Sequence, residues 1–548
     1  MAAALRALSP ELVRPRQPWS FGFRRCLASP SRTMMTELEH KSDGAFARHI
    51  TGPKAGGFAR GSFIAWRRDE RKRESKLVGT PIEDLYKLVD KVGEGAVGTV
   101  YSARHKRTGE VVAIKSISKS HMPDEEALRL EVGFLKIFDH PNTVRYYETI
   151  EDDEHIHLVM EMCSGGSLQK HIKNVHGSWG QGVCENELAR ITVQMLQAVA
   201  HCHAHSVAHR DIKPQNLLFS CGSPARGSAI PVACSGRGDA PLKLVDFGIS
   251  GVIRNDKPRK RLLTKCAGTV GFMAPEVFGA RPYCGRSADI FSIGAVMHNM
   301  IAGVPATWEK DQGEYKYSGK IRWKRLTQDG QSLLEHLLHS EPELRPTAVE
   351  ALAHPWFQAM GVHQASNGGA DLDIPTILNR CFLRMHEFCH RSKLQQLIMY
   401  SIVAFAPLHN HHMEQLRVAF LVADKGSSNG ISCFDFVELG RKHSSLTSSE
   451  LRRIFTTANV SRTGKLSYCE WLTASAPPDW YSHRDHAARA FATLDVTGNG
   501  YVCATDLSQL LPEVFEAGEI EGDILRHVPG GNGKLHFEDF CRYDLSQG

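Results

Sequence analysis

The chain has 548 residues, of which 42% are hydrophobic and 23% charged, and its formal net charge is +6. This length predicts two to four domains, and the composition excludes a fully disordered chain, a collagen and a small disulfide-bonded scaffold. The 14 cysteines form no CxxC pair, which favours a reducing compartment. The longest apolar run, 397–408, is shorter than the ~20 residues of a membrane-spanning helix, so we expect no membrane span.

Charge is distributed unevenly along the chain. Residues 1–80 contain 16 Lys and Arg against 7 Asp and Glu, whereas the rest is slightly acidic. We therefore predict a disordered basic extension over 1–80 and no nucleic-acid-binding surface on the body. Because the first 32 residues are also Arg-rich and acid-poor, organelle import is the alternative to the cytoplasmic location that we expect. Ala2 excludes N-myristoylation, which requires glycine at that position.

The first predicted elements are three short strands. Segments 85–95, 99–105 and 111–117 alternate apolar and polar residues or are rich in β-branched ones, and short turns separate them. Helical periodicity dominates from about residue 187, in ELARITVQMLQAVAHCHAH. A small β-rich part followed by a larger helical part predicts an α+β arrangement.

A glycine-rich segment, GEGAVGTV at 93–100, lies between the first two predicted strands. Because no helix follows it directly, a dinucleotide-binding site is disfavoured. Glycines let the backbone approach phosphates closely, so we predict that this segment covers a nucleoside triphosphate. Lys115 lies in the third strand, where a buried lysine needs a carboxylate partner, and Glu131 in the next helical segment is the expected one. This pair would place Lys115 on the α- and β-phosphates.

Three further motifs follow in order: HRDIKPQN at 209–216, DFG at 246–248 and APE at 274–276. Asp211 can accept or orient the proton of a substrate hydroxyl. Asn216 and Asp246 offer the hard oxygen ligands that Mg²⁺ prefers. Lys213 is placed to neutralise the charge of a transferred γ-phosphate.

In order and spacing, these motifs resemble the signature set of the eukaryotic protein kinases, across about residues 85–357. The resemblance implies the bilobal α+β protein kinase fold, ATP and Mg²⁺ as cofactors, and protein substrates. Lys213 and the pair Gly268-Thr269 are similar to the serine/threonine class. In that class Thr269 would hydrogen-bond near Asp211 and Lys213 and so hold the acceptor loop.

The same resemblance implies scaffold roles and nucleotide contacts. Asp289 and Arg345 would be buried structural charges, with Arg345 paired to Glu276. The implied ATP contacts comprise the glycine-rich segment, the residues that sandwich adenine, the gatekeeper and hinge, and the two charged phosphate and metal contacts: Val92, Gly93, Glu94, Gly95, Ala96, Val97, Gly98, Val100, Ala113, Met160, Glu161, Cys163, Lys115 and Asp246.

Two departures from the family pattern concern specificity and activation. Ser167 and Gln215 stand where kinases that select a basic residue upstream of the acceptor often carry acids. We therefore predict a weakened preference for Arg three residues before the acceptor. Lys265 stands where many relatives carry a phosphorylatable or acidic residue, and we expect it to repel Arg210, which leaves Thr264 as the candidate phosphosite.

The rest of the chain is similar to the C-terminal part of the calcium-dependent protein kinases of plants and protists, with a helical junction and then four EF-hand-like loops. The resemblance implies that segment 388–403 is a junction helix, and that the junction restrains the kinase until calcium rearranges the C-terminal lobe. The expected division is a basic extension at 1–80, a kinase domain at 85–357, a regulatory junction at 358–410 and an all-α EF-hand-like lobe at 411–548.

The four loops depart from full EF-hand chemistry, which requires oxygen ligands at positions 1, 3, 5, 7, 9 and 12 and glycine at position 6. We rank the third loop first for calcium and the second loop next. The first loop, 424–435, has lost ligands, and the fourth begins with Val528, which cannot ligate. The predicted ligands are Asp495, Thr497, Asn499, Tyr501 and Asp506 in the third loop, and Asn459, Ser461, Thr463, Lys465 and Glu470 in the second.

The sequence thus predicts an ATP- and Mg²⁺-dependent protein serine/threonine kinase that responds to calcium through its C-terminal lobe. One alternative keeps the kinase but makes the lobe a calcium-independent docking module, with its loops paired through Ile431 and Leu466 and through Val502 and Leu535. A second alternative is a pseudokinase scaffold, against which the complete motif set argues. The histidine-rich segment 201–209 resembles a metal site in composition only, because it ends a helix and opens the catalytic loop.

Overall fold

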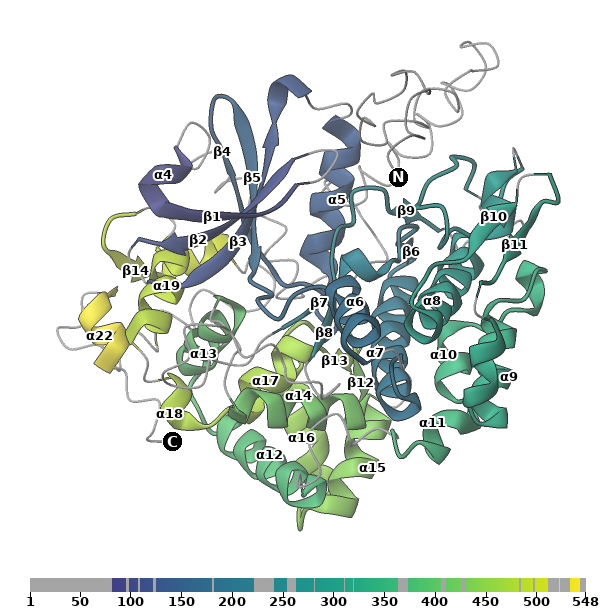
Figure 1. Ribbon diagram of the computed structural model, residues 1–548. Helices are drawn as coiled ribbons and strands as arrows, with labels where there is room; N and C mark the ends of the chain where they lie inside the picture. Colours follow the sequence, from purple (N-terminus) through teal and green to yellow (C-terminus); the bar gives the residue numbers. More distant parts are fainter. Residues whose placement is uncertain are drawn as a thin grey trace, which may run out of the picture. The chain divides into compact units, whose positions relative to one another are not determined.

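The computed structural model describes residues 81–542 with gaps, the longest at 221–240, 254–262, 363–372, 511–521 and 523–532. The predicted α+β architecture is confirmed, because an antiparallel sheet is followed by a larger helical part and then by a second helical region (Figure 1). The basic extension predicted at 1–80 lies outside the described residues. Among the helices that are described, none is both long and apolar enough to cross a membrane.

The first lobe is built on a five-stranded antiparallel sheet with the strand order β1-β2-β3-β5-β4. Its strands are β1 (Tyr86–Glu94), β2 (Thr99–His105), β3 (Val111–Ser118), β4 (Tyr146–Glu151) and β5 (His155–Glu161). The three predicted strands are confirmed to within one residue at each end. The short helix α4 (Ile82–Leu85) contributes Ile82 to a small core with Val112, Ile114 and Val159. Helix α5 (Glu125–Ile137) follows β3 and lies beside the sheet (Figure 1).

The second lobe is mainly helical, with two long buried helices at its centre. Helix α7 (Glu185–Ala204) packs against α8 (Gly285–Ala302), and both are buried along most of their length. Helix α8 ends at Gly303, whose φ of 81° is the left-handed conformation that favours glycine there. The other helices are α6 (Leu168–Trp179), α9 (Gln328–Leu337), α10 (Ala348–Leu352) and α11 (Pro355–Ala359). The short strands are β6 (Val207–Ala208), β7 (Leu217–Phe219), β8 (Leu242–Leu244), β9 (Gly251–Val252), β10 (Thr307–Glu309) and β11 (Glu314–Lys316).

The C-terminal region has a hydrophobic core of its own, whose described members lie between Ile374 and Phe540 and include residues of the predicted junction such as Leu378 and Ile398. Its helices are α12 (Ile374–Phe388), α13 (Lys393–Phe405), α14 (His411–Ala423), α15 (Cys433–His443), α16 (Ser448–Ala458), α17 (Tyr468–Ser475), α18 (Pro478–Tyr481), α19 (Arg484–Leu494), α20 (Ala504–Leu510) and α22 (Phe537–Arg542). The junction is therefore packed into the EF-hand-like lobe by its apolar side chains.

The junction helix predicted over 388–403 is wrong at its N-terminal end. Helix α12 ends at Phe388, and α13 begins only at Lys393. The break is fixed by Ser392 and Gln395, because Ser392 N donates to Gln395 Oε1 at 2.9 Å while Gln395 N donates to Ser392 Oγ at 3.2 Å. This reciprocal pair is a capping box, which starts a new helix by satisfying two unpaired N–H groups.

The EF-hand-like loops are joined in pairs by two-stranded ribbons. Strand β12 (Ile431–Ser432) pairs with β13 (Lys465–Leu466), and β14 (Tyr501–Cys503) pairs with β15 (Lys534–His536). The predicted partners are confirmed, since Ile431 lies opposite Leu466 and Val502 lies opposite Leu535. All four side chains are buried, so this pairing ties the loops to the core of the C-terminal region.

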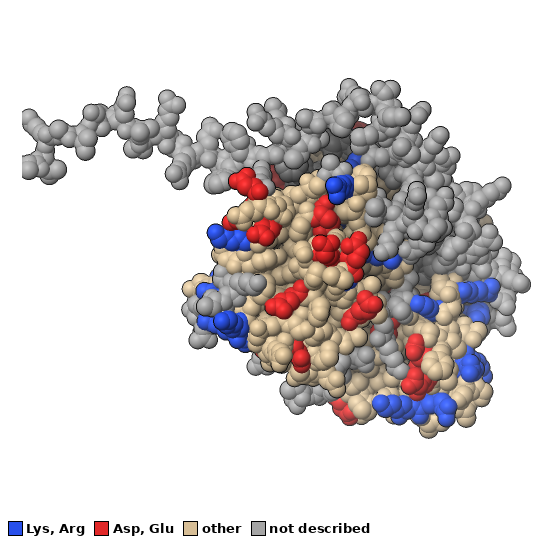
Figure 2. Space-filling view, turned by 90° about the vertical axis from the view of Figure 1, so that its right-hand side faces the viewer, with Lys and Arg blue, Asp and Glu red and all other residues tan. Residues whose placement is uncertain are grey.

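One face of the molecule can be seen in Figure 2. Acidic side chains lie across its middle, and most Lys and Arg side chains lie toward its edges. Acidic side chains therefore predominate at the centre of the described part of this face.

Candidate active site

Three charged side chains meet between the two lobes of the kinase domain, and we call this position the cleft. Lys115, on β3, lies with its Nζ 2.6 Å from Oε1 of Glu131 on α5. The same Nζ lies 3.1 Å from Oδ1 of Asp246, which is 131 positions away in the chain. The structure thus brings together the lysine, the glutamate and the DFG aspartate that the sequence motifs singled out.

The charges in this cluster stabilise one another. Burial favours the neutral amine of Lys115, but Glu131 and Asp246 outweigh it and raise its pKa. Burial likewise disfavours the charged form of Asp246, but the nearby ammonium of Lys115 holds the pKa of that carboxyl below its usual value. Since 49% of the Asp246 side chain remains exposed, its carboxylate can accept a further ligand. The site therefore offers a fixed ammonium and an accessible carboxylate at neutral pH.

The catalytic-loop aspartate is held from two sides. Lys213 Nζ donates to Asp211 Oδ2 at 2.6 Å, and Thr269 Oγ1 donates to Asp211 Oδ1 at 2.7 Å. Lys213 Nζ also donates to Thr269 Oγ1 at 3.0 Å, which confirms the predicted contact of Thr269 with both residues. Asn216 adds two bonds, from its Nδ2 to Asp211 O at 2.9 Å and to Asp211 Oδ2 at 3.1 Å. These contacts fix the direction in which the Asp211 carboxylate faces.

Asn216 and Asp246 fit the chemistry of a magnesium site. The amide nitrogen of Asn216 is engaged by Asp211, so its amide oxygen is the group left to act as an acceptor. Asp246 supplies a charged and half-exposed carboxylate. Hard oxygen donors of these two kinds are those that Mg²⁺ binds together with substrate phosphates.

A buried aspartate supports the backbone beneath this loop. Asp289 on α8 is fully buried and accepts hydrogen bonds from the main-chain N–H groups of His209 and Arg210, both at 2.8 Å, and from His203 Nε2 at 2.9 Å. Arg210 and Asp246 have φ values of 71° and 65°, in the left-handed region. Such residues cost ~1–3 kcal/mol each and persist where the surroundings fix them, as at functional sites. The scaffold role predicted for Asp289 is consistent with these contacts.

The Arg345–Glu276 pair predicted from the family resemblance is confirmed. Arg345 Nη1 and Nη2 donate to the two carboxylate oxygens of Glu276 at 2.7 and 2.9 Å. This bidentate arrangement ties the APE segment to the loop before α10 and is the stronger form of ion pair.

Arg210 donates to a main-chain carbonyl of the segment between the DFG and APE motifs. Its Nη2 donates to Lys265 O at 2.8 Å, and Tyr283 OH donates to the same oxygen at 3.0 Å. The predicted repulsion concerned the Lys265 side chain, but the group that faces Arg210 is the Lys265 carbonyl. This contact ties the segment around Lys265 to the catalytic loop.

The predicted nucleotide contacts lie on neighbouring strands. Val100 is the cross-strand partner of Lys115, and Ala113 is the partner of Met160. Gly98 is required by close packing, because a Cβ atom there would lie 2.4 Å from the carbonyl oxygen of Ser116. Three predicted contacts, Gly95, Ala96 and Val97, lie outside the described residues.

The second EF-hand-like loop gathers its predicted ligands. Ser461 Oγ donates to Asn459 Oδ1 at 3.0 Å and lies 3.1 Å from Thr463 Oγ1, which donates to Lys465 O at 2.8 Å. Ser461 N donates to Glu470 Oε1 at 2.7 Å. Burial raises the pKa of Glu470 to about 7, against the effect of the hydrogen bonds that favour its charged form. The loop therefore holds five oxygen donors with a single buried carboxyl group, which a cation would stabilise in its charged form.

In the third loop the two aspartates accept hydrogen bonds from main-chain N–H groups, one at each end of the loop. Asp495 accepts from Asn499 N at 3.0 Å and from Gly500 N at 2.9 Å, which shapes the start of the loop. Asp506 is fully buried, and its Oδ2 accepts from Cys503 N at 3.1 Å, at the start of α20. Thr497 lies outside the described residues, as do residues 425–429 of the first loop and Val528 in the fourth.

The histidine-rich segment is part of the packing of the kinase domain. The ring of His201 lies 4.5 Å from that of His205 and stacks on His140 at 5.0 Å. Burial lowers the pKa of His201 well below its ordinary value, so the ring is neutral. His203 pairs with Asp289, and His209 Nε2 lies 3.0 Å from Val245 O. These rings contact one another and the scaffold, as expected for a structural cluster.

Sequence reasoning missed the contacts between the kinase domain and the C-terminal region. Arg145 Nη1 donates to Val403 O, in the last turn of α13, at 2.9 Å. Asp139 Oδ2 accepts from Cys469 N, in the first turn of α17, at 2.8 Å. The main chain of Arg145 also reaches the hinge, since its N–H donates to Glu161 Oε2 at 3.2 Å. No residue pattern marks these contacts, because the partners of both side chains are main-chain groups.

Comparison with known proteins agrees with this geometry. A family model of the protein kinase domain matches residues 86–357. The chain is 31% identical over 494 residues to calcium-dependent protein kinase 16 of Oryza sativa subsp. japonica, a match that covers 86% of this chain and 84% of the rice protein. It is 28% identical over 484 residues to calcium-dependent protein kinase 33 of Arabidopsis thaliana, covering 85% of this chain and 86% of that protein.

The fold, the cleft and the kinase-domain match define a protein serine/threonine kinase. The matches to these two relatives cover 85–86% of this chain, so they extend well beyond the kinase domain into the C-terminal region. The chain therefore belongs to the calcium-dependent protein kinase family, as the sequence motifs had indicated.

Proposed function

We propose that this kinase transfers the γ-phosphate of ATP to protein serine and threonine hydroxyls with the residues gathered at the cleft, and that calcium bound in its C-terminal loops controls the transfer. The observation that supports the catalytic part most directly is the 3.1 Å contact between Lys115 Nζ and Asp246 Oδ1. It joins the nucleotide-binding strand of one lobe to the metal-binding motif of the other. A pseudokinase scaffold is not favoured, because it would have no need of this charged cluster.

Phosphoryl transfer depends mainly on positioning and on neutralising charge. Lys115, held by Glu131, would bind the α- and β-phosphates. Asp211 would orient the acceptor hydroxyl and take its proton as the new O–P bond forms. Lys213 would neutralise the γ-phosphate as the bond to the β-phosphate breaks. Bound Mg²⁺ would supply further neutralisation of phosphate charge, with Asn216 and Asp246 as the residues that hold it.

Calcium would bind in the second and third EF-hand-like loops. In the second loop, Glu470 is a buried carboxyl group whose pKa of about 7 would fall once a cation lay beside it. In the third loop, Asp495 and Asp506 supply two carboxylates. Both loops have fewer charged ligands than a full EF-hand loop, so weaker binding than in a full sensor is expected.

The contact between α13, α17 and the kinase domain would carry the calcium signal. Glu470 directly follows Cys469, whose N–H is bound by Asp139 of the kinase domain. A movement of Glu470 on calcium binding would therefore displace Cys469 and alter this hydrogen bond. Arg145 connects the junction to the hinge, because its side chain donates to Val403 O on α13 and its main-chain N–H donates to Glu161.

Substrate selection and location follow from the sequence features already described. We propose that Ser167 and Gln215, both neutral, weaken selection for Arg three residues before the acceptor, and strong selection for Arg there in a peptide library would contradict this. The described cysteines are all free, which supports a reducing compartment, and we propose the cytoplasm.

The test measures transfer of labelled phosphate to a serine peptide by the full chain with Mg-ATP, in calcium or in EGTA, and by a chain that ends at Phe357. Calcium is expected to raise the rate of the full chain, and the truncated chain is expected to exceed the full chain in EGTA. Equal rates in calcium and EGTA would favour a calcium-independent docking lobe. Failure of every form to transfer phosphate would favour a scaffold.

A further inference from the structure

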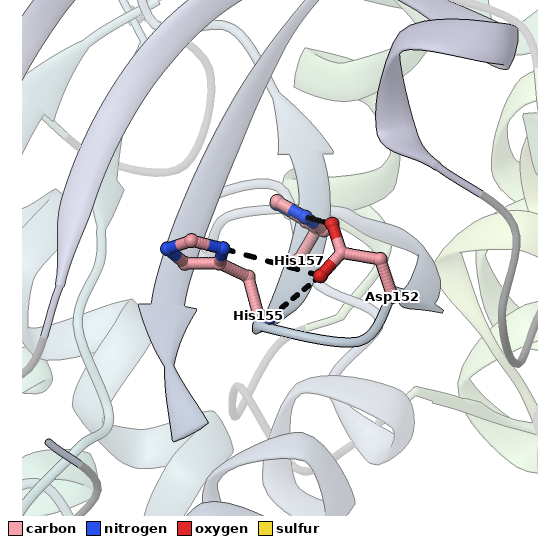
Figure 3. A group of neighbouring side chains, drawn as sticks. All are labelled: Asp152, His155 and His157. Atoms are coloured by element: carbon pink, nitrogen blue, oxygen red, sulfur yellow. Dashed lines mark hydrogen bonds and ion pairs between the residues drawn. The ribbon is translucent and has the colours of Figure 1, made fainter. Parts of the chain in front are cut away.

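A cluster of two histidines and an aspartate lies at the tip of the β4–β5 hairpin, away from the catalytic cleft. Asp152, His155 and His157 each offer one ligand atom, and these atoms lie within 4.8 Å of one another (Figure 3). None of the motifs that define the kinase includes these residues.

Strand geometry explains why the three side chains converge. His155 and His157 are two positions apart on β5, so they point to the same face of the sheet. The turn is closed by Asp152 N, which donates to His155 O at 3.1 Å and places the Asp152 side chain opposite both rings. His157 Nε2 lies 2.8 Å, and His155 Nδ1 3.9 Å, from the Asp152 carboxylate. Figure 3 shows both rings turned toward it.

The groups around the cluster hold its ligands in place. Asp152 Oδ1 accepts from Glu154 N at 2.9 Å and from His155 N at 2.6 Å. Partial burial disfavours its charge, but these bonds and that of His157 keep the pKa of Asp152 below its ordinary value. The other ring nitrogen of His157, Nδ1, lies 2.8 Å from Ser116 Oγ. Metal-ligating histidines usually donate their other ring N–H to an oxygen acceptor, and Ser116 Oγ is within reach for that role here.

We propose that Asp152, His155 and His157 form a binding site for a divalent transition-metal ion, with Zn²⁺ as the representative ion. Zn²⁺ accepts imidazoles as well as carboxylates, whereas Ca²⁺ and Mg²⁺ take oxygen ligands, so the two imidazoles favour a transition-metal ion. Metal–ligand bonds of ~2.0–2.1 Å with tetrahedral angles place any two ligand atoms about 3.3 Å apart. This distance lies between the 2.8 Å and 3.9 Å that separate the two histidine nitrogens from the Asp152 carboxylate. Three protein ligands leave the fourth position to water.

Metal binding requires a defined proton movement. The metal takes the lone pair of His157 Nε2, so that nitrogen cannot carry the proton that it would donate to Asp152. The neutral ring then carries its proton on Nδ1 and donates it to Ser116 Oγ, which is already within hydrogen-bonding distance. His155 binds through Nδ1, and no oxidant or other reactant is needed.

The site is separate from the nucleotide cleft. His157 is the cross-strand partner of Ser116, whereas Lys115, the next residue along β3, points to the other face of the sheet. His155 is 38% exposed at its side chain, so an ion can reach it from solvent. Loss of the site is therefore expected to leave Mg-ATP binding and phosphate transfer unchanged.

The test measures the number of Zn²⁺ ions bound by the full chain, by competition with a chromophoric chelator after metal removal. Wild type is expected to bind one more ion than His155→Ala or Asp152→Asn. The control His443→Ala removes an imidazole from α15 in the C-terminal region and is expected to match wild type. Retained peptide phosphorylation and unchanged circular dichroism confirm that the variants are folded. Equal stoichiometry in wild type and both site variants would overturn the proposal.

A second measurement identifies the ligand itself. With Co²⁺ as the probe, His155→Cys is expected to add a sulfur-to-cobalt charge-transfer band that wild type lacks. The band is expected to weaken at least several-fold when Asp152→Asn is added, because one ligand is then lost. A purely structural role for these residues would produce no new band. Absence of the band in His155→Cys would therefore also contradict the proposal.

Discussion

Arg145 joins the kinase domain to the C-terminal region through one hydrogen bond, and replacing it with alanine tests whether that contact carries regulation. Arg145 Nη1 donates to Val403 O at 2.9 Å, at the C-terminal end of α13. A hydrogen bond to a charged group contributes about 1.5–3 kcal/mol, and its loss leaves the carbonyl without this donor. A loss of about 2 kcal/mol shifts the docking equilibrium about thirty-fold.

The assay is a calcium titration of peptide phosphorylation by the full chain. Because the chain that ends at Phe357 lacks this contact and is expected to exceed the full chain in EGTA, Arg145→Ala is expected to raise the rate in EGTA and so to reduce the stimulation by calcium. The matched control is Arg104→Ala, because Arg104 Nη1 donates to Gly109 O at 2.6 Å within the first lobe and does not involve the junction. If Arg145→Ala and Arg104→Ala respond alike to calcium, the contact does not transmit the signal.

Three further predictions follow from other contacts. Glu131→Gln removes the charge that holds Lys115 and should lower kcat/KM for ATP about a hundred-fold, whereas an unchanged value would exclude the pair from catalysis. Burial lowers the pKa of His140 to about 3, so near pH 6.5 only the unfolded chain takes up a proton at this ring. The free energy of unfolding should therefore fall as the pH drops below 6.5, by about 2 kcal/mol at about pH 5. Chemical unfolding of His140→Gln should show a smaller fall over the same pH range. Ser392→Ala should lower the free energy of unfolding by about 1 kcal/mol, and adding Gln395→Ala should cost little more because both belong to one capping box; full additivity would argue against the box.

The sequence was most informative where a residue type requires a particular kind of partner, as a buried charge requires an opposite charge. Lys115 on a buried strand needed a carboxylate, and Glu131 meets that need at 2.6 Å. The loop pairing was also predictable, because an apolar side chain at a fixed loop position must be buried, as Val502 and Leu535 are. The strands of the first lobe followed from their alternation.

Contacts made by main-chain groups could not be predicted. Arg145 and Asp139 bind a carbonyl and an N–H that every residue possesses, so only the packing of the chain determines which ones they meet. The break before α13 was missed for another reason. The helix over 388–403 was predicted from the family resemblance alone, and the Ser392–Gln395 signature, although visible in the sequence, was not used.

The most direct test of the catalytic account is the single-turnover rate of phosphate transfer by Asp211→Asn with Mg-ATP and a serine peptide. Asparagine keeps the shape of the side chain but cannot take the hydroxyl proton, so the rate is expected to fall by about 10²–10⁴-fold while ATP binds as tightly as before. A rate equal to that of the wild-type protein would contradict the assignment of Asp211 and, with it, the proposed arrangement of the cleft.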